Sequence, residues 1–308
     1  MSAIVDILLP IFALILLGYL GRRSGRLGPA AASELNRFVV WFGLPALIFD
    51  VTANADWTQL WQPGFVIAFS IGCLGIFVAT LFWRLRSRPL ADASLDALTA
   101  SYANTGYIGI PLCTLVFGTS GLQPALIASL IVVCVLFALA IACLETGLHA
   151  GQPLARTLRK VGLSLLRNPL VVAPLVGVAW GASGLGVAEP LQRMLSLLGA
   201  ATAPCALVCL GAFLAQDQQG SARGAWPLVG VKLVLQPALT GALAFWVFEL
   251  PTMWALAALL LSALPTGTGP FMLAEYYQRE AALSARVILL STLGALLSLS
   301  LCLYLLPA

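Results

Sequence analysis

The stretch that decides the fold is NTGYIGIP, Asn104 to Pro111, which interrupts an otherwise apolar run of the chain. Its glycines, amide, hydroxyl and proline disfavour a continuous helix. Backbone groups that leave a helix inside a membrane find no water, so such a break is tolerated only where protein buries it or a wet cavity adjoins it. The interruption therefore predicts a site at membrane depth, provided that the surrounding chain spans a membrane.

The composition indicates a membrane protein. The chain has 308 residues, of which 60% are hydrophobic and 9% charged, and its mean hydropathy is +0.98. Soluble domains carry about 25% charged residues, and a spanning helix needs roughly 20 apolar residues. The sequence predicts an all-α polytopic membrane protein with ten spanning helices, at about 3–21, 35–53, 63–83, 95–117, 124–145, 168–186, 191–215, 226–248, 251–275 and 285–306.

The basic residues predict the orientation of the helices. Because Arg22, Arg23 and Arg26 follow the first apolar run instead of preceding it, that run is interpreted as a retained helix, not a signal peptide. Fifteen of the 16 Lys and Arg residues fall in or beside alternate loops, and Arg193 is the exception. The positive-inside rule then predicts cytoplasmic loops at these places and both termini outside, in the cell membrane. The net charge of +4 follows from this topology and indicates no nucleic-acid partner.

Cysteine and histidine offer no metal site or cofactor site. All seven cysteines fall in the expected helices without a CxxC pair, which favours packing as small apolar residues. His149 is the sole histidine and falls in a loop, so a histidine-based metal site is excluded by number.

The two halves of the chain resemble each other. PIFALILLGYLGRRSG at 10–25 and PLVVAPLVGVAWGASG at 169–184 share a proline and two glycines at an offset of 159 residues, and the same offset carries Pro45 onto Pro204. A repeat of five helices is odd, so the second copy must enter the membrane from the opposite side. Such inverted repeats are a transporter architecture.

The repeat divides the chain into a first copy over 1–145, a short cytoplasmic linker over 146–167 and a second copy over 168–308. SYANTGYIGIPL in the span 95–117 and SALPTGTGPFML in the span 251–275 place Thr-Gly pairs 161 residues apart. Both spans are thus expected to be broken and to cross near the midplane. Half-helix N-termini would then point free N–H groups at a small anion.

These residues resemble the auxin efflux carrier family, which includes the plant PIN-type exporters and bacterial carriers of malonate, malate and related acids. LPALIF, NTGYIGIP, LVLQP and the proline-rich span 251–275 occur in the family's order over nearly the whole chain. The resemblance implies two inverted five-helix repeats, a scaffold domain, a transport domain and a homodimer formed through the scaffold. It extends more distantly to the sodium–bile-acid symporter superfamily. The long central loop of the plant exporters is missing here.

By analogy with the family's motif, Asn104 is the leading candidate for binding a carboxylate, because its amide can donate a hydrogen bond. Threonines offer hydroxyls, glycines allow close approach and prolines keep each helix open. The candidate substrate-binding residues are Asn104, Thr105, Gly106, Tyr107, Gly109, Pro111, Ser129, Pro265, Thr266, Gly267, Thr268 and Pro270.

Ionisable residues inside the membrane are candidates for coupling. Asp50 and Glu275 are the two carboxylates considered, each against a plain interfacial or solvated role. Lys232 is expected to extend its side chain to the cytoplasmic surface, and Gln236 to form a helix–helix hydrogen bond. Proton coupling, sodium coupling, facilitated transport and a potential-driven carrier all remain open.

The sequence thus favours a secondary transporter of small organic anions, working by efflux or exchange with alternating access. The alternative is a sodium- or proton-coupled symporter of a bile-acid-like or other amphipathic anion. A membrane enzyme is disfavoured because no HExxH, GxSxG, histidine cluster or paired intramembrane aspartate occurs. A channel is disfavoured by the repeat and by the lack of charged rings.

Overall fold

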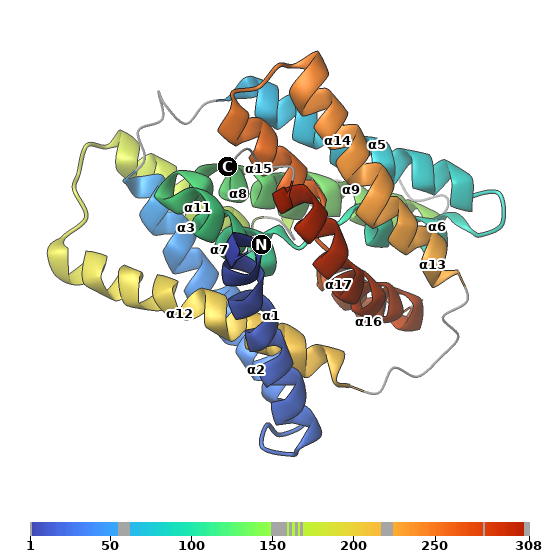
Figure 1. Cartoon of the computed structure of the whole chain (residues 1–308), viewed down its shortest axis with the longest axis horizontal. Helices are drawn as coiled ribbons and strands as arrows, with labels where there is room; N and C mark the ends of the chain where they lie inside the picture. Colours follow the sequence, from blue (N-terminus) through green and yellow to red (C-terminus); the bar gives the residue numbers. More distant parts are fainter. Residues whose placement is uncertain are drawn as a thin grey trace.

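The fold is helical throughout the part of the chain that can be described. The computed structural model describes residues 2–54, 62–148, 159, 162–163, 166, 169–216, 224–279 and 281–304. These residues form helices, turns and connecting segments, with one isolated β-bridge and no strand among them (Figure 1). Most of the expected linker 146–167 lies outside the described residues.

Helical segments occupy all five positions expected in the first half of the chain. They are α1 Ser2–Arg23, α2 Ala31–Phe38, η1 Val39–Gly43, α3 Leu44–Ala53, α5 Pro63–Arg84, α6 Leu90–Ser101, η2 Thr105–Gly109, α7 Ile110–Phe117, η3 Gly118–Gly121, α8 Leu122–Leu130, η4 Ile131–Leu136 and α9 Phe137–Leu148.

The second half likewise has helical segments at its five expected positions. They are α11 Pro169–Ala182, α12 Glu189–Leu214, α13 Ala225–Gly230, η5 Val231–Leu235, α14 Gln236–Ala242, η6 Leu243–Val247, α15 Thr252–Ser262, α16 Gly269–Tyr276 and α17 Ala281–Tyr304.

Length and composition make this a multi-pass membrane protein. Six helical stretches of the described residues are long and apolar enough to cross a bilayer: Ala31–Ala53, Pro63–Arg84, Thr105–Leu148, Glu189–Leu214, Ala225–Val247 and Ala281–Tyr304. Thr105–Leu148 has 44 residues, about twice the length of one span. It contains the short 3₁₀ turn η3, where Gly118 has φ of +65°.

Prolines explain where several helices change their winding. Pro45, Pro111 and Pro237 each stand second in a helix that follows a π-helical turn: η1 before α3, η2 before α7 and η5 before α14. A proline has no N–H and its ring clashes with the carbonyl four residues back. A π turn, with its wider ring, accommodates both effects without ending the helix. The π turns therefore allow these helices to continue through their prolines.

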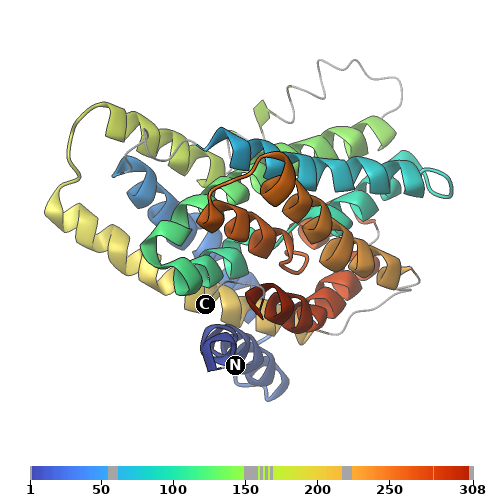
Figure 2. The ribbon, with the colours of Figure 1, turned by 45° about the horizontal axis from the view of Figure 1, so that its top comes forward.

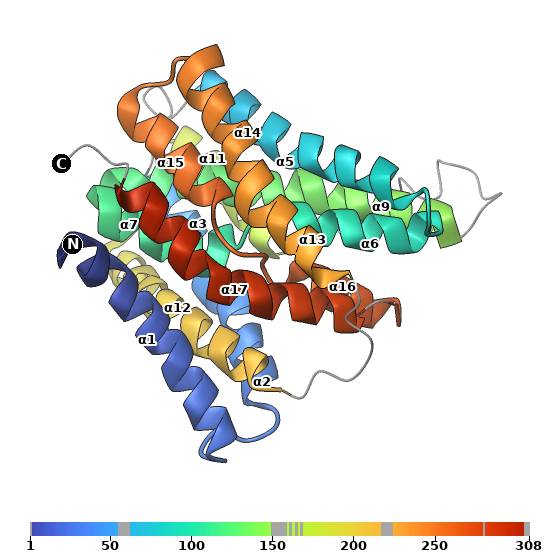
Figure 3. The same cartoon turned by 45° about the vertical axis from the view of Figure 1, so that its right-hand side comes forward.

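The helices pack as two groups. The four-helix group contains α1, α2–α3, α11 and α12, in which α1 packs on α12 and α3 packs on both α11 and α12. The six-helix group contains α5, α6–α7, α8–α9, α13–α14, α15–α16 and α17. Figure 3 shows α1, α2 and α12 on one side and α5, α6, α13 and α14 on the other, and Figure 1 shows the same separation.

Glycines allow very close packing inside the four-helix group. A Cβ added at Gly18 of α1 would collide with the backbone of Val208 in α12, and one at Gly211 of α12 would collide with that of Ile15 in α1. On the other seam, a Cβ at Gly181 of α11 would lie 2.9 Å from the carbonyl oxygen of Ala53 in α3. Close backbone approach through small residues is how membrane helices gain packing energy.

The arrangement of the two groups sets where a site can form. Figure 2 shows α1 at the edge of the molecule, and Figure 3 shows the start of α1 near the end of α17. Between the groups, α7 contacts α1 and η2 contacts α12. The first broken helix therefore lies at the boundary between the groups.

Candidate functional site

The first break lies between α6 and η2. Helix α6 ends at Ser101, and the next three residues run as extended or irregular backbone. Ala103 forms an antiparallel bridge with Thr266, the centre of the second break. Asn104 N donates to Pro265 O at 2.9 Å. The structure thus brings the two predicted breaks into direct contact.

The second break lies between α15 and α16. Pro265 cannot donate a backbone hydrogen bond, so the helix does not continue through it. Thr266 N donates to the Ser291 hydroxyl at 3.0 Å, and the Thr266 hydroxyl donates to Thr99 O at 2.9 Å. Helix α16 begins at Gly269 with Pro270 in its first turn, a favourable position for proline. The hydroxyl of Thr266 therefore ties the second break to α6, and its N–H ties the same break to α17.

The two breaks supply hydrogen-bond partners for some of each other's backbone groups. The sequence predicts free N–H groups that face a ligand, yet Asn104 N donates to Pro265 O and Gly267 N donates to Tyr102 O at 3.0 Å. Buried N–H groups rarely stay unpaired, and the opposite break supplies the nearest carbonyls. These two N–H groups are therefore not free, which differs from the expectation from sequence.

Asn104 is the side chain best placed to recognise an acceptor. It is 5% exposed, and its Oδ1 accepts a hydrogen bond from Tyr107 N at 3.3 Å, which caps η2. Its Nδ2 is buried and has no partner among the described residues. A buried donor without a partner costs about 1–3 kcal/mol. An acceptor atom arriving at this amide would recover that cost.

A cavity of about 400 Å³ lies between the first broken helix and the four-helix group. Gly106, Ile110 and Pro111 line it from the break, and Leu47 and Pro204 are among the residues opposite. Gly106 follows Asn104 by two residues, so the cavity begins beside the capped start of η2. Its lining is mostly apolar, with Thr114 and Thr202 as its polar side chains. The space is large enough for a small organic acid.

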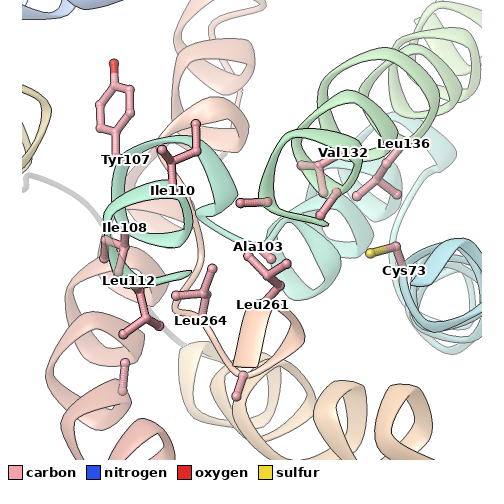
Figure 4. Packing of buried hydrophobic residues seen from close by; sticks show 14 of the residues in the cluster. Cys73, Ala103, Tyr107, Ile108, Ile110, Leu112, Val132, Leu136, Leu261 and Leu264 are labelled. Carbon is pink, nitrogen blue, oxygen red and sulfur yellow. The ribbon is translucent and has the colours of Figure 1, made fainter. Parts of the chain in front are cut away.

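Glycines bring the two broken helices together. A Cβ at Gly109 would lie 2.8 Å from Leu261, and one at Gly267 would lie 2.9 Å from the ring of Tyr102. Figure 4 shows buried residues around the breaks, including Ala103 and Leu261. Sequence reasoning missed Tyr102, although an aromatic residue two positions before Asn104 could have indicated it.

Tyr107 connects the two helix groups. Its ring points away from the other labelled side chains in Figure 4, and its hydroxyl donates to Asn36 Oδ1 on α2. Ser129 donates to Ala125 O in its own helix at 2.7 Å, so its hydroxyl is already bonded there. Thr105 is buried and Thr268 is half-buried beside the breaks.

The structure places Asp50, one of the two candidate coupling carboxylates, within the four-helix group. Its Oδ1 accepts from Gln192 Nε2 of α12 at 2.5 Å and from Asn54 Nδ2 at 2.8 Å. It thus joins the end of α3 to the start of α12. The side chain of Glu275 lies outside the described part of the structure.

Lys232 differs from the expectation. The sequence predicts a side chain that reaches the cytoplasmic surface, but Lys232 is 0% exposed and its Nζ donates to Ser262 O at 2.7 Å. Depth along the helix is readable from sequence, whereas the direction of the side chain depends on packing. Gln236 makes the predicted helix–helix bond, since its Nε2 donates to Ser101 O at 3.0 Å.

Comparisons with known proteins agree with these features. A family model described as "Membrane transport protein" matches residues 3–303. A protein of Rhizobium meliloti, provisionally named a malonate transporter, is 28% identical over 309 residues, covering 99% of this chain and 96% of the relative. YfdV of Escherichia coli K12, named an uncharacterized transporter, is 25% identical over 237 residues, covering 75% and 74%. Auxin efflux carrier component 8 of Arabidopsis thaliana is 24% identical over 348 residues, covering 95% and 94%.

Proposed function

The chain belongs to the membrane transport protein family that includes the auxin efflux carriers, as its motifs predicted, and on this basis we propose that it is a secondary carrier of small organic anions. Carboxylates are the proposed substrates, carried by efflux or exchange. The name of the Rhizobium meliloti relative refers to malonate, which makes malonate the first acid to test.

The observation that carries the proposal is the buried, unpartnered Nδ2 of Asn104 beside the second break. A carboxylate oxygen would accept this hydrogen bond, and the gain would exceed that from a neutral acceptor because the acceptor is charged. Recognition by an amide needs no buried cation at the cavity. A half-helix N-terminus, here the start of η2, adds a favourable partial positive charge.

Alternating access is proposed to move the six-helix group against the four-helix group. The cavity between the two groups supports this mechanism, because their relative motion would change its exposure. The packing supports an inverted repeat: α1 packs on α12 as α11 packs on α3, and α5 packs on α6 as α14 packs on α15. Gly25 and Gly184, related by the offset of 159, both have positive φ, at +77° and +69°.

We further propose that both termini lie outside the cell membrane and that two copies associate through the four-helix group. The exposed leucines of α1 and α12, such as Leu17 and Leu197, would face lipid or a second copy. Mass analysis in detergent that finds only monomer at every concentration would count against the dimer.

The experiment that tests the function is uptake of labelled mono- and dicarboxylates into proteoliposomes holding the purified chain. We expect saturable uptake of unaltered acid, accelerated by unlabelled acid inside. Chemical conversion of the acid would indicate an enzyme, and uptake without acceleration would indicate a channel. No uptake of any acid in the panel would refute the proposal.

The apolar lining of the cavity favours a second candidate, a symporter of an amphipathic anion such as a bile acid. An amphipathic acid in this cavity would place its bulky apolar group against residues such as Ile11 and Leu207. Competition separates the two: an amphipathic acid should block uptake far better than a short dicarboxylate if the second candidate holds.

A further inference from the structure

Lys232 lies in an environment that is unusual for a lysine, because its side chain is buried. It lies in η5 of the six-helix group, fully buried, with Nζ 2.7 Å from Ser262 O. Ser262 is the last residue of α15, the half-helix that ends at the second break. No Asp or Glu forms an ion pair with Lys232 among the described residues. Its polar partner is therefore a helix end and not a carboxylate.

Gln236 repeats this contact at the other break. It follows Lys232 by one helical turn, and its Nε2 donates to Ser101 O at 3.0 Å. Ser101 is the last residue of α6, the half-helix that ends at the first break. One stretch of helix, η5 with the start of α14, thus contacts the C-terminal carbonyl of both half-helices.

Helix C-termini have unsatisfied carbonyls and a partial negative charge, which favours a cation. In transporters with broken helices, the ends of half-helices and unwound carbonyls are where coupling sodium ions bind. A lysine ammonium is a compact cation with three donors and can satisfy the same carbonyl oxygen. Burial of an ammonium is costly unless such partners are present, so its position against this helix end is informative.

We propose that the Lys232 ammonium is a resident cation that takes the place of a coupling sodium ion at the end of α15. The inference rests on the proposed function and defines its coupling: anion carriage needs no sodium. Lys232 acts as a positioning residue, because it holds the end of α15 and, through it, the break that carries Pro265 and Thr266.

The internal repeat gives this proposal a second observation. Lys232 is separated from Cys73 of α5 by the repeat offset of 159 residues. Cys73 is buried and has a thiol where Lys232 has an ammonium group. Its sulfur lies 3.3 Å from Gln236 Nε2. The first copy thus has no cationic side chain at the position that corresponds to Lys232. The end of its half-helix, α6, accepts a hydrogen bond from the Gln236 amide instead. One resident cation serves the pair of breaks.

The test compares thermal unfolding of the purified protein in sodium chloride and in choline chloride, without substrate. We expect the unfolding midpoint of the wild type to be the same in both salts. Lys232→Ser leaves an oxygen-lined space that sodium can enter, so sodium should raise its midpoint by a few degrees over choline. Lys232→Met supplies no oxygen and should not respond. Val234→Ser, at an exposed position of the same helix, is the matched control.

Two results would overturn the proposal: a wild type that sodium stabilises, or a folded Lys232→Ser that responds to sodium no more than Lys232→Met. If Lys232→Ser does not fold, Lys232→Gln, which keeps donors without the charge, takes its place with the same expectations. A merely structural lysine would lower stability without creating a preference for sodium.

Labelled malonate counterflow in proteoliposomes adds a functional measurement. Wild-type counterflow should be equal in sodium and choline, and Lys232→Met should lower it about tenfold or more, as expected for one lost bond to a charged group. Sodium-dependent wild-type counterflow would refute the resident cation. If the wild type carries no acid, the proposed function fails, while the unfolding comparison still decides the role of Lys232.

Discussion

Replacing Asn104 by alanine separates recognition of the ligand from stability of the fold. The side chain makes one described hydrogen bond, from Tyr107 N to Oδ1 at 3.3 Å, and leaves Nδ2 buried without a partner. Asn104→Ala removes both atoms. It should therefore weaken ligand binding while the ligand-free protein changes little.

The magnitudes support this separation. Loss of the N-cap side chain, whose Oδ1 accepts the 3.3 Å bond, costs about 0.5–2 kcal/mol. Relief of a buried unpaired donor returns about 1–3 kcal/mol. The two terms oppose each other, so the net change in the free energy of unfolding should be close to zero. In the complex, the lost bond to a carboxylate costs about 1.5–3 kcal/mol, or roughly 10- to 150-fold in affinity.

The assay is equilibrium binding of the best acid from the panel to purified protein, alongside thermal unfolding without ligand. Asn104→Asp keeps an acceptor for Tyr107 N but replaces the donor with a negative charge, so it should bind at least as weakly as the alanine variant. Thr146→Ala, an exposed residue bonded within its own helix, is the control. Wild-type affinity in Asn104→Ala, with a fold of normal stability, would show that the acid binds elsewhere.

Three further outcomes are expected. Tyr107→Phe removes the hydrogen bond to Asn36 that joins the two helix groups. If that bond breaks in each transport cycle, counterflow should rise by about 2- to 10-fold. An unchanged rate would argue that the bond does not break during transport. Pro111→Ala restores an N–H after η2 and lets the helix tighten, so turnover should fall while binding affinity is kept, and loss of affinity instead would contradict this. A cysteine introduced within 146–167 should resist an impermeant thiol reagent applied outside intact cells, and labelling there would reverse the proposed orientation.

Much of the helical layout follows from local chemistry, which is why sequence predicts it. Apolar length gives the positions of the helices, and Gly, Pro and Thr give the position of each break. Asn104 is a candidate because of the family's motif, and its bond from Tyr107 N is likewise local. These features depend on near neighbours in the chain.

Features that depend on packing between distant segments are not readable in this way. Lys232 has the sequence context of a surface-seeking lysine, yet its ammonium faces Ser262 because η5 turns it inward. The Tyr107–Asn36 bond joins residues 71 positions apart. The backbone bond from Asn104 to Pro265 depends on two breaks meeting, which no local pattern measures.

The glycine seams of the four-helix group have a consequence for how the protein is made. Helix α1 is synthesised before α12, whose backbone packs against Gly18, and α3 meets its glycine partners in α11 and α12. During translation, the first half of the chain must therefore wait in the bilayer with these backbone surfaces uncovered. They close only when the second half has been inserted. A nascent chain stopped before residue 169 lacks α11 and α12, on which α1 and α3 pack. Quality-control proteases should therefore treat it as unassembled.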